Sequence, residues 1–578
     1  MNVLSSRLAA GMIVTACSLL LAPTARAQSA DPYEKYKFEA LQFSQLQATG
    51  TTRTQSMGGA GSALGADLGS SVLNPANLGS YRRSEFSFTP GLQFNSTEST
   101  AGFAGQARTS IASDGRNSFN IANLGVVITT RTDNGSSDWR SGAVGINFSR
   151  LATLSNRRTY ALAGLDSSRS LHEYVLQDFF LPDKGAGIIE DVVENSNEEI
   201  VNNFADLAFN TKLLDFEKNA QGQYTGGTII PKWYQSTARQ SETTELRGAV
   251  NQIDIGYGAS YRDKLYVGGS LGIVTMRYQQ TRTLTETLDA PRTGRASEVA
   301  SLSLRDGYET QGAGVNLRVG LVYRPNDVIR LGAAIQTPTF ASGLKEKAEA
   351  TTLTAAYRQP YGPESVTSKS ASIVASEFQY NLTTPFRATG GLTLIFKSAP
   401  QVAQAVSADA LAGSGSVVGG LISADIDYVN YGAARLSAID NDPVGANFSA
   451  ANAAIRTEYA SAINYRVGAE LRLGDFRVRG GYGRYGTPYQ TAGRGGERTV
   501  IGGGVGIRRE KGYVDIGFSR TTYTADLYRP YELTTYDPTA DGGKGDYKPY
   551  STATAAEPVI SASVTLLNPT VTIGFIIE

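Results

Sequence analysis

Apolar and polar residues alternate along most of this chain with a period of two. In 462–473, for example, apolar residues occupy every second position from Ile463 to Leu473, and Asn, Arg, Gly and Glu stand between them. Successive side chains of a strand point to opposite faces. The pattern therefore predicts strands with one apolar and one polar face, and it recurs at 312–323 and 421–430.

The alternating segments have about the length that crosses an outer membrane, roughly 9–11 residues. Two of them are long and contain Pro385 and Pro569, which we interpret as bulges or as extensions beyond the membrane. The fold class expected is all-β, a transmembrane antiparallel β-barrel of about 14 strands. The predicted strands are 84–95, 118–130, 141–151, 250–261, 265–279, 311–323, 328–338, 376–397, 420–430, 462–473, 476–486, 498–509, 512–523 and 557–577.

Short and long connections alternate between these strands. Short turns are expected on the periplasmic side and long loops outside, which makes residues 398–419 an unusually long periplasmic connection. The even strand count places both barrel ends in the periplasm. The predicted external loops are 152–249, 281–310, 339–375, 431–461 and 524–556.

Charged residues fall on the polar face of the predicted strands. An ionised side chain that faces lipid at mid-depth costs about 2–4 kcal/mol for Arg or Lys, so this face is expected to line the lumen. Pairing that braces the wall is favoured over an ion path, because buried ions are normally paired. The lumen charges predicted are Arg318, Asp425, Asp427, Arg466, Glu470 and Arg472.

Residues 1–27 have the pattern of a secretory signal. Arg7 precedes a largely apolar run, and Ala25-Arg26-Ala27 has the small-x-small form of a cleavage site. A lipoprotein signal ending at Cys17 is the alternative, but the apolar run continues past that cysteine. An exported chain fits an outer-membrane barrel.

Small residues dominate the stretch between the signal and the first predicted strand. Residues 57–78 are rich in glycine and alanine and contain Asn74-Pro75, a turn signal. Such a segment cannot build a core of its own, but it can pack closely against a wall. We therefore expect residues 28–83 to form an N-terminal plug in the lumen of the barrel 84–578. A surface linker with an Asn-Pro turn is the alternative.

This stretch resembles the N-terminal hatch of the FadL family of outer-membrane channels for hydrophobic compounds. At Asn77, where the family commonly has glycine, and at Phe575, which is not the last residue, the chain departs from the expected pattern. The hatch residues that the resemblance covers are Met57, Gly58, Gly59, Ala60, Asp67, Asn74, Pro75 and Ala76.

The resemblance implies passive uptake of hydrophobic small molecules, such as long-chain fatty acids or aromatic hydrocarbons, across the cell outer membrane of a Gram-negative-type bacterium. The expected partners are such a ligand and outer-membrane lipid, with no nucleic acid, and the chain is expected to be a monomer and not an enzyme. The alternatives are a structural or adhesive surface barrel that binds a partner through its long loops, and a general porin.

Composition narrows the chemistry further. Cys17 and His172 are the only cysteine and histidine, and 53 basic residues balance 53 acidic ones. Thiol catalysis and multi-histidine metal sites are therefore excluded, and no global field attracts nucleic acid. No catalytic residue, cofactor or metal is expected. The glycine run 502–506 lacks the following helix that a phosphate loop needs.

The predicted loop 152–249 is the best candidate for capturing a ligand. Two apolar clusters lie in it, and the second has helical spacing. Amphipathic segments above a barrel can form an apolar groove, but they can equally bury each other as a cap. The candidate capture residues are Phe179, Phe180, Leu181, Phe204 and Leu207.

Overall fold

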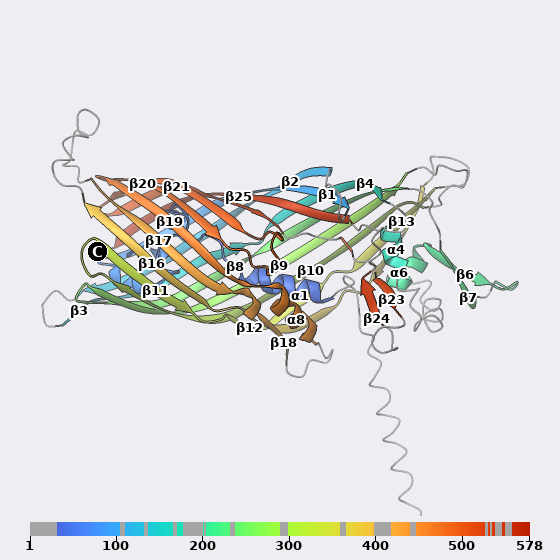
Figure 1. Ribbon diagram of the computed structural model, residues 1–578, viewed down its shortest axis with the longest axis horizontal. Helices are drawn as coiled ribbons and strands as arrows, with labels where there is room; N and C mark the ends of the chain where they lie inside the picture. Colours follow the sequence, from blue (N-terminus) through green and yellow to red (C-terminus); the bar gives the residue numbers. More distant parts are fainter. Residues whose placement is uncertain are drawn as a thin grey trace, which may run out of the picture.

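The computed structural model describes most of the chain (Figure 1). The described residues are 32–103, 110–131, 137–165, 170–176, 200–201, 204–222, 224–231, 237–289, 299–358, 366–397, 418–439, 447–525, 530–531, 534–537, 546–549 and 558–577. The predicted signal segment 1–27 lies outside them, and so do Phe179, Phe180 and Leu181. Among the described residues, no helix is long and apolar enough to cross a membrane.

Fourteen antiparallel strands form a closed barrel, because the last strand pairs with the first. Every neighbouring pair is antiparallel, and the strand order follows the sequence. In that order the strands are β1 (Ser84–Phe103), β2 (Ser110–Arg131), β3 (Trp139–Thr153), β8 (Ala238–Tyr261), β9 (Leu265–Leu288), β10 (Val299–Tyr323), β11 (Ile329–Gln336), β16 (Arg387–Lys397), β17 (Val418–Asn430), β19 (Ser461–Leu473), β20 (Phe476–Tyr485), β21 (Arg498–Arg509), β22 (Gly512–Thr524) and β25 (Pro558–Ile577).

Shorter elements extend or cap the barrel at the end that carries the long loops. The strands among them are β4 (Asn156–Leu165), β5 (Ile200–Val201), β6 (Leu214–Lys218), β7 (Tyr224–Pro231), β12 (Phe340–Ala348), β13 (Thr351–Arg358), β14 (Val366–Ile373), β15 (Glu377–Thr383), β18 (Arg435–Ala438), β23 (Thr534–Asp537) and β24 (Asp546–Pro549). The helices there are α4 (Leu171–Leu176), α6 (Phe204–Asn210), η4 (Tyr431–Ala433) and α8 (Ser449–Glu458).

The predicted barrel of about 14 strands is confirmed, but several strands are longer than predicted. The predicted loop 152–249 contains β4 and the first half of β8, so this part of that prediction is wrong. The pairing continues beyond the apolar belt, where a strand no longer needs an apolar outer face to be stable. Pro385 separates β15 from β16, whereas Pro569 stays inside β25.

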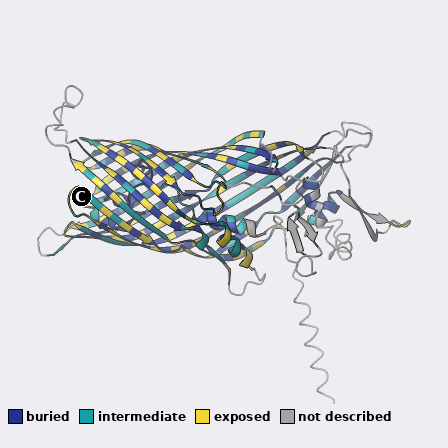
Figure 2. Ribbon diagram, in the orientation of Figure 1, coloured by how far each residue is buried: buried dark blue, intermediate teal, exposed yellow. Residues whose placement is uncertain are grey.

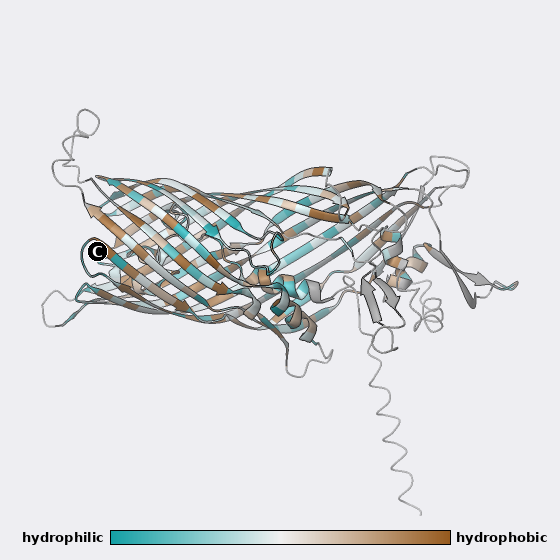
Figure 3. Ribbon diagram, viewed as in Figure 1, coloured by the Kyte–Doolittle hydropathy of each residue, from teal (hydrophilic) through white to brown (hydrophobic). Residues whose placement is uncertain are grey.

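The outer surface of the barrel carries a belt of exposed apolar side chains. Val319 is 60 % exposed and Ile516 is 56 % exposed, and their sequence neighbours Arg318 and Asp515 are buried on the inner face. Figures 2 and 3 show this alternation along the strands at the end of the barrel that carries the C-terminus. A band of this kind matches the hydrocarbon region of a membrane and costs free energy in water.

The N-terminal segment fills the lumen. It contains α1 (Pro32–Ser44), α2 (Thr52–Ser56), α3 (Leu68–Ser71) and η1 (Pro75–Ser80). α1 lies toward the long-loop end, near α8 (Figure 1), and η1 contacts β8, β9 and β10 near their short turns. The chain therefore enters the barrel from above the belt and leaves into β1 at the short-turn end.

Candidate functional site: the hatch and a gap in the barrel wall

Three short helices give the hatch a fixed shape, and a polar side chain caps each of them. Thr51 caps α2 by accepting from the backbone N–H of Thr54, and Asp67 caps α3 by accepting from Ser70. Asn74 caps η1 through Ala76, and Pro75 occupies the first helical position, where its missing N–H is no loss. The sequence Asn-Pro-Ala is thus a capped helical start.

Inward-facing glycines on the wall let the hatch backbone approach the strands closely. A Cβ built on Gly481 would lie 2.0 Å from the carbonyl carbon of Met57, and one on Gly468 would lie 2.6 Å from the same residue. On the other side of the barrel, a Cβ on Gly268 would lie 2.5 Å from Pro75. Any larger residue at these positions would push the hatch off its seat.

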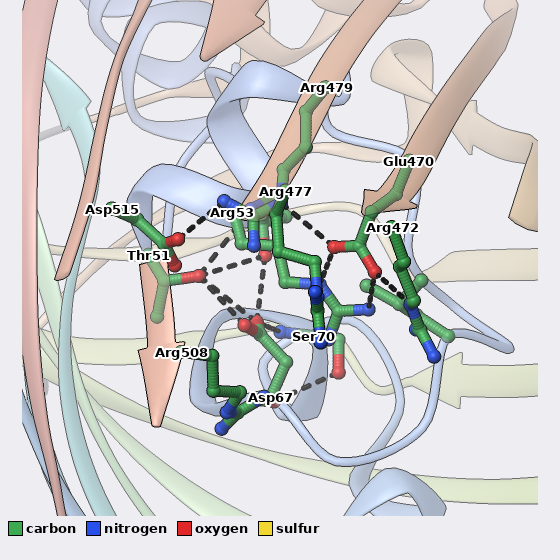
Figure 4. A network of polar contacts seen from close by, with 12 residues as sticks. Thr51, Arg53, Asp67, Ser70, Glu470, Arg472, Arg477, Arg479, Arg508 and Asp515 are labelled. Atoms are coloured by element: carbon green, nitrogen blue, oxygen red, sulfur yellow. Dashed lines mark hydrogen bonds and ion pairs between the residues drawn. The ribbon is translucent and has the colours of Figure 1, made fainter. Parts of the chain in front are cut away.

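An ionic network joins the hatch to the wall (Figure 4). Arg53 of α2 donates to both oxygens of Glu470, over 2.8 and 3.2 Å. Arg479 also donates to Glu470 over 2.8 Å and to Asp515 over 2.6 Å. Buried charges of this kind are stable only when every partner is present. Removing one partner would therefore loosen the hatch.

Asp67 organises the hatch from within, next to this network. Its carboxylate accepts from Thr54 over 2.9 Å, from the Thr51 hydroxyl over 3.0 Å and from the backbone N–H of Ser70 over 2.9 Å. Asn77 ties the same loops together, since its amide accepts from Gly65 and donates to three hatch carbonyls. An asparagine at this position is therefore a cross-brace of the hatch.

The other predicted lumen charges also point inward. Asp425 accepts from the backbone N–H of Gly61 over 2.8 Å and from the hydroxyl of Ser62 over 2.7 Å. Arg318 lies 3.5 Å from Asp254, and Arg466 lies 3.9 Å from Asp425. The structure thus places the six predicted charges on one inner surface, where they pair with each other, with the hatch or with other wall residues. These are Arg318, Asp425, Asp427, Arg466, Glu470 and Arg472.

The wall has a gap between β2 and β3. Their hydrogen-bonded ladder ends at Asn123 and Ser149, although β2 continues upward along β1. At this level the register shifts leave two bulged residues, Ala122 in β2 and Leu151 in β3. Each bulge bends its strand. The two strands therefore diverge just above the ladder.

Above the gap β4 lies beside β2 without a ladder between them, and hydrogen bonds from side chains join the two strands. Thr159 of β4 donates to Asp114 of β2 over 2.6 Å, and Arg157 lies 3.3 Å from the same carboxylate. Phe94 and Phe119, which are 41 % and 66 % exposed, lie on β1 and β2 at this height. The gap therefore opens at the upper edge of the apolar belt.

Two cavities lie inside the barrel, on either side of the segment 46–49. One has a volume of about 30 Å³ and borders the gap, with Ala122, Arg150 and Thr153 in its lining. The other has a volume of about 50 Å³, and Leu73 and Leu151 line it together with Arg318 and Arg466. Gln47 and Thr49 line both cavities. A short stretch of the N-terminal segment thus separates the interior from the gap.

Apolar and aromatic packing closes the upper lumen. Tyr36 of α1 meets the rings of Phe448 and Tyr380 edge-on, with centroids 5.3 and 5.6 Å apart. Leu41 and Phe43 of α1 are buried in the same cluster. The helix is therefore held by burial of apolar surface, worth about 25 cal/mol per Å².

A second apolar cluster lies nearer the long loops. Leu207 of α6 is fully buried in it, and Phe204 packs at its margin against Tyr174. These two predicted capture residues thus belong to a packed cap, as in the alternative that the helical spacing left open. His172 is buried in α4. No group of three metal-binding side chains occurs in the described part of the chain.

The gap and α1 are the features that sequence reasoning missed. A signal for the gap exists in β3, where apolar residues occupy positions 144, 146 and 148 and the next one is Leu151. This phase shift in the alternation marks the bulge. The sequence of α1 contains no comparable signal, because the residues that it packs against are distant in the sequence. They belong to β10, β12, β15 and α8.

No family model matches the chain, and no curated protein matches it. Similar solved structures include a FadL homologue from Pseudomonas aeruginosa, at 10 % identity with a TM-score of 0.46. They also include toluene transporters, TbuX of Ralstonia pickettii (15 %, 0.42) and TodX of Pseudomonas putida (14 %, 0.42). Each match covers 92 % of this chain and 99 % of the other.

A FadL homologue is thus among the matched structures, as the resemblance of the hatch residues predicts. At identities of 10–15 % and TM-scores below 0.5, these similarities do not establish the function of this chain. Its function rests on the geometry of the hatch, the gap and the cavities.

Proposed function

We propose that this chain is an outer-membrane channel for the passive uptake of hydrophobic small molecules, such as long-chain fatty acids or aromatic hydrocarbons. In this proposal the ligand enters from the long-loop side, passes the segment 46–49 and leaves sideways through the gap between β2 and β3. The hatch, residues 50–80, blocks the straight route to the periplasm.

The gap at the upper edge of the apolar belt is the observation that carries this proposal. An apolar solute gains about 0.8 kcal/mol for each methylene that it transfers out of water. An exit that opens beside lipid lets the solute keep this gain, whereas an exit into the periplasm would return it to water. The small cavity behind the gap supports such a path, provided that Gln47 and Thr49 move aside.

The same observations weigh against the general porin. A porin needs a water-filled axial lumen, but here hatch residues hydrogen-bond to opposite walls, as Thr52 does with Thr572 over 2.8 Å and Asn74 with the Leu321 carbonyl over 3.1 Å. The adhesive barrel makes a different prediction, because deletion of a loop would then abolish partner binding without changing uptake.

A tryptophan in the gap tests the route. Ala122 lines the cavity behind the gap and is 4 % exposed, so Ala122→Trp is expected to close it and to reduce uptake of a radiolabelled long-chain fatty acid and of toluene at least tenfold. The matched control is Ala333→Trp on the exposed outer face of β11. Heat-modifiable migration reports whether each barrel is assembled.

Mass spectrometry of the purified barrel, for co-purifying fatty acids or hydrocarbons, identifies the ligand class. Equal uptake by both tryptophan variants would rule out the lateral route. An empty barrel, together with normal growth of a deletion strain on hydrophobic carbon sources, would rule out the transport function itself.

A further inference from the structure

The inner helix α1 carries an excess of negative charge in its buried seat. Glu39 is 1 % exposed and accepts from Thr310 of β10 over 3.1 Å and from the Tyr380 hydroxyl of β15. Glu346 of β12 is 4 % exposed and pairs with Lys35. Two carboxyl groups thus share one ammonium group in this part of the described structure.

Among the described residues, Lys35 is the cation that acts on Glu39. Lys35 lies over the ring of Tyr308, 3.6 Å from its centroid. Lys37 is on the opposite side of α1, where it donates to Glu458 of α8 over 2.6 Å. The groups that face Glu39 from the packed elements are Lys35 and Tyr36 of α1, Tyr278 of β9, Tyr308 and Thr310 of β10, Glu346 of β12 and Tyr380 of β15.

Burial, and after it the neighbouring Glu346, raises the pKa of Glu39 to about 7. A protonated Glu39 is neutral in its buried seat and still accepts through its carbonyl oxygen. An ionised Glu39 adds a buried negative charge beside Glu346, which low-dielectric surroundings disfavour. The seat therefore keeps Glu39 protonated to a higher pH than water does, although Lys35 and the hydrogen bonds from Tyr380 and Thr310 favour the ionised form.

The position of α1 links the protonation state of Glu39 to the segment between the two cavities. Its last residue, Ser44, is separated by a single residue from the segment 46–49, which separates the two cavities. Arg387 of β16 donates to the Ser44 carbonyl, and Arg498 of β21 donates to the Leu46 carbonyl over 2.9 Å. Movement of α1 would strain these two hydrogen bonds, which fix the start of the segment between the interior and the gap.

We propose that Glu39, Glu346 and Lys35 form a proton-controlled latch that holds α1 in the upper lumen and thereby keeps segment 46–49 between the two cavities. The latch regulates the channel described above, so its effect on uptake rests on that proposed function. The docking of α1 itself does not.

The direction of the pH dependence follows from the docked and released states of Glu39. Released into water, the carboxyl returns to its ordinary pKa of 4.5. Docking of α1 is strongest below pH 4.5, weakens as the pH rises and is weakest above pH 7.

Hydrogen exchange measured by mass spectrometry tests the latch in the full-length barrel in detergent, without any substrate. After correction for intrinsic exchange rates, amides of residues 36–46 are expected to be protected at least tenfold better at about pH 5 than at about pH 8. In Glu39→Gln, which keeps the side-chain shape and cannot ionise, this difference is expected to disappear, with the helix protected at both values.

The matched control is Glu458→Gln, which removes the other ion pair of α1 and keeps Glu39. It is expected to lower protection at both pH values and to preserve the difference between them. Equal protection of the wild type at the two values, or a difference that survives in Glu39→Gln, would overturn the latch. An infrared carboxyl band that titrates near pH 7 in the wild type and is absent from Glu39→Gln checks the assignment independently of exchange.

If α1 shows the exchange difference but the barrel takes up substrate equally well at both pH values, the regulatory role of the latch is overturned. If the barrel transports nothing at either pH while α1 still shows the exchange difference, the proposed function fails and the latch stands.

Discussion

Two parts of the same N-terminal segment fill one lumen by different physics. The hatch from Gly50 to Ser80 is held by hydrogen bonds, ion pairs and backbone contact with glycines, as in the pairing of Arg53 with Glu470. α1 is held mainly by rings and apolar side chains, such as Phe43 and Phe448. The polar seat lies at the level of the membrane belt, and the apolar seat lies above it.

The difference reflects what faces each part. Within the belt the strands must show apolar residues to lipid, so their polar residues point inward and the hatch has to satisfy them. Above the belt the outer face meets water, and apolar residues can turn inward to form a core. Small residues suit the first seat and aromatic residues suit the second. Three substitutions test whether the two seats are independent.

Glu470→Gln is expected to have the largest effect. It removes the negative charge shared by three arginines (Arg53, Arg472 and Arg479), and breaking a buried pair costs about 3–5 kcal/mol. Amide exchange is expected to rise across the hatch, with α1 unchanged. Glu497→Gln, which breaks an exposed pair with Arg484, is the control. Equal loosening of α1 would show that the two seats are coupled.

Phe448→Ala is expected to affect the upper seat. Phe448 is 6 % exposed and contacts Tyr36 and Tyr380, and truncation of a buried phenylalanine costs about 3 kcal/mol. Exchange of α1 is expected to rise, with the hatch still protected. Phe340→Ala, at a residue that is 55 % exposed, should change neither. Loss of hatch protection in Phe448→Ala would contradict the separation of the seats.

Gly481→Ala is expected to cost about 2 kcal/mol, the usual penalty for overpacking. Its methyl group would collide with Met57, whereas a Cβ on the adjacent Gly480 meets nothing within 4 Å. Limited proteolysis of the hatch in Gly481→Ala and Gly480→Ala therefore separates loss of the close approach from a change in strand propensity. Identical cleavage of the two variants would show that the hatch does not depend on this contact.

The barrel itself could be predicted from the sequence, because alternation is a local property. Each strand reports its inner and outer faces through its own side chains, and Arg318 or Glu470 is assigned to the lumen without knowledge of any neighbour. Small residues with Asn74-Pro75 likewise mark the hatch. The predicted loop 152–249 was too long for the same reason, since strands above the belt have no apolar outer face and therefore lack the alternating pattern.

Only the tertiary structure decides which residues meet. Arg53 and Glu470 are separated by 417 residues and Glu39 and Tyr380 by 341, so no local pattern links them. The gap between β2 and β3 depends on two bulges at the same height in neighbouring strands, and the spacing of residues in the sequence does not give the relative heights of two strands. The sequence by itself determined a polar-lined, plugged barrel, because the alternation of apolar and polar residues is a property of consecutive positions. Closure of the barrel decided the ion pairs, the gap and the seat of α1, because it brings distant strands into register.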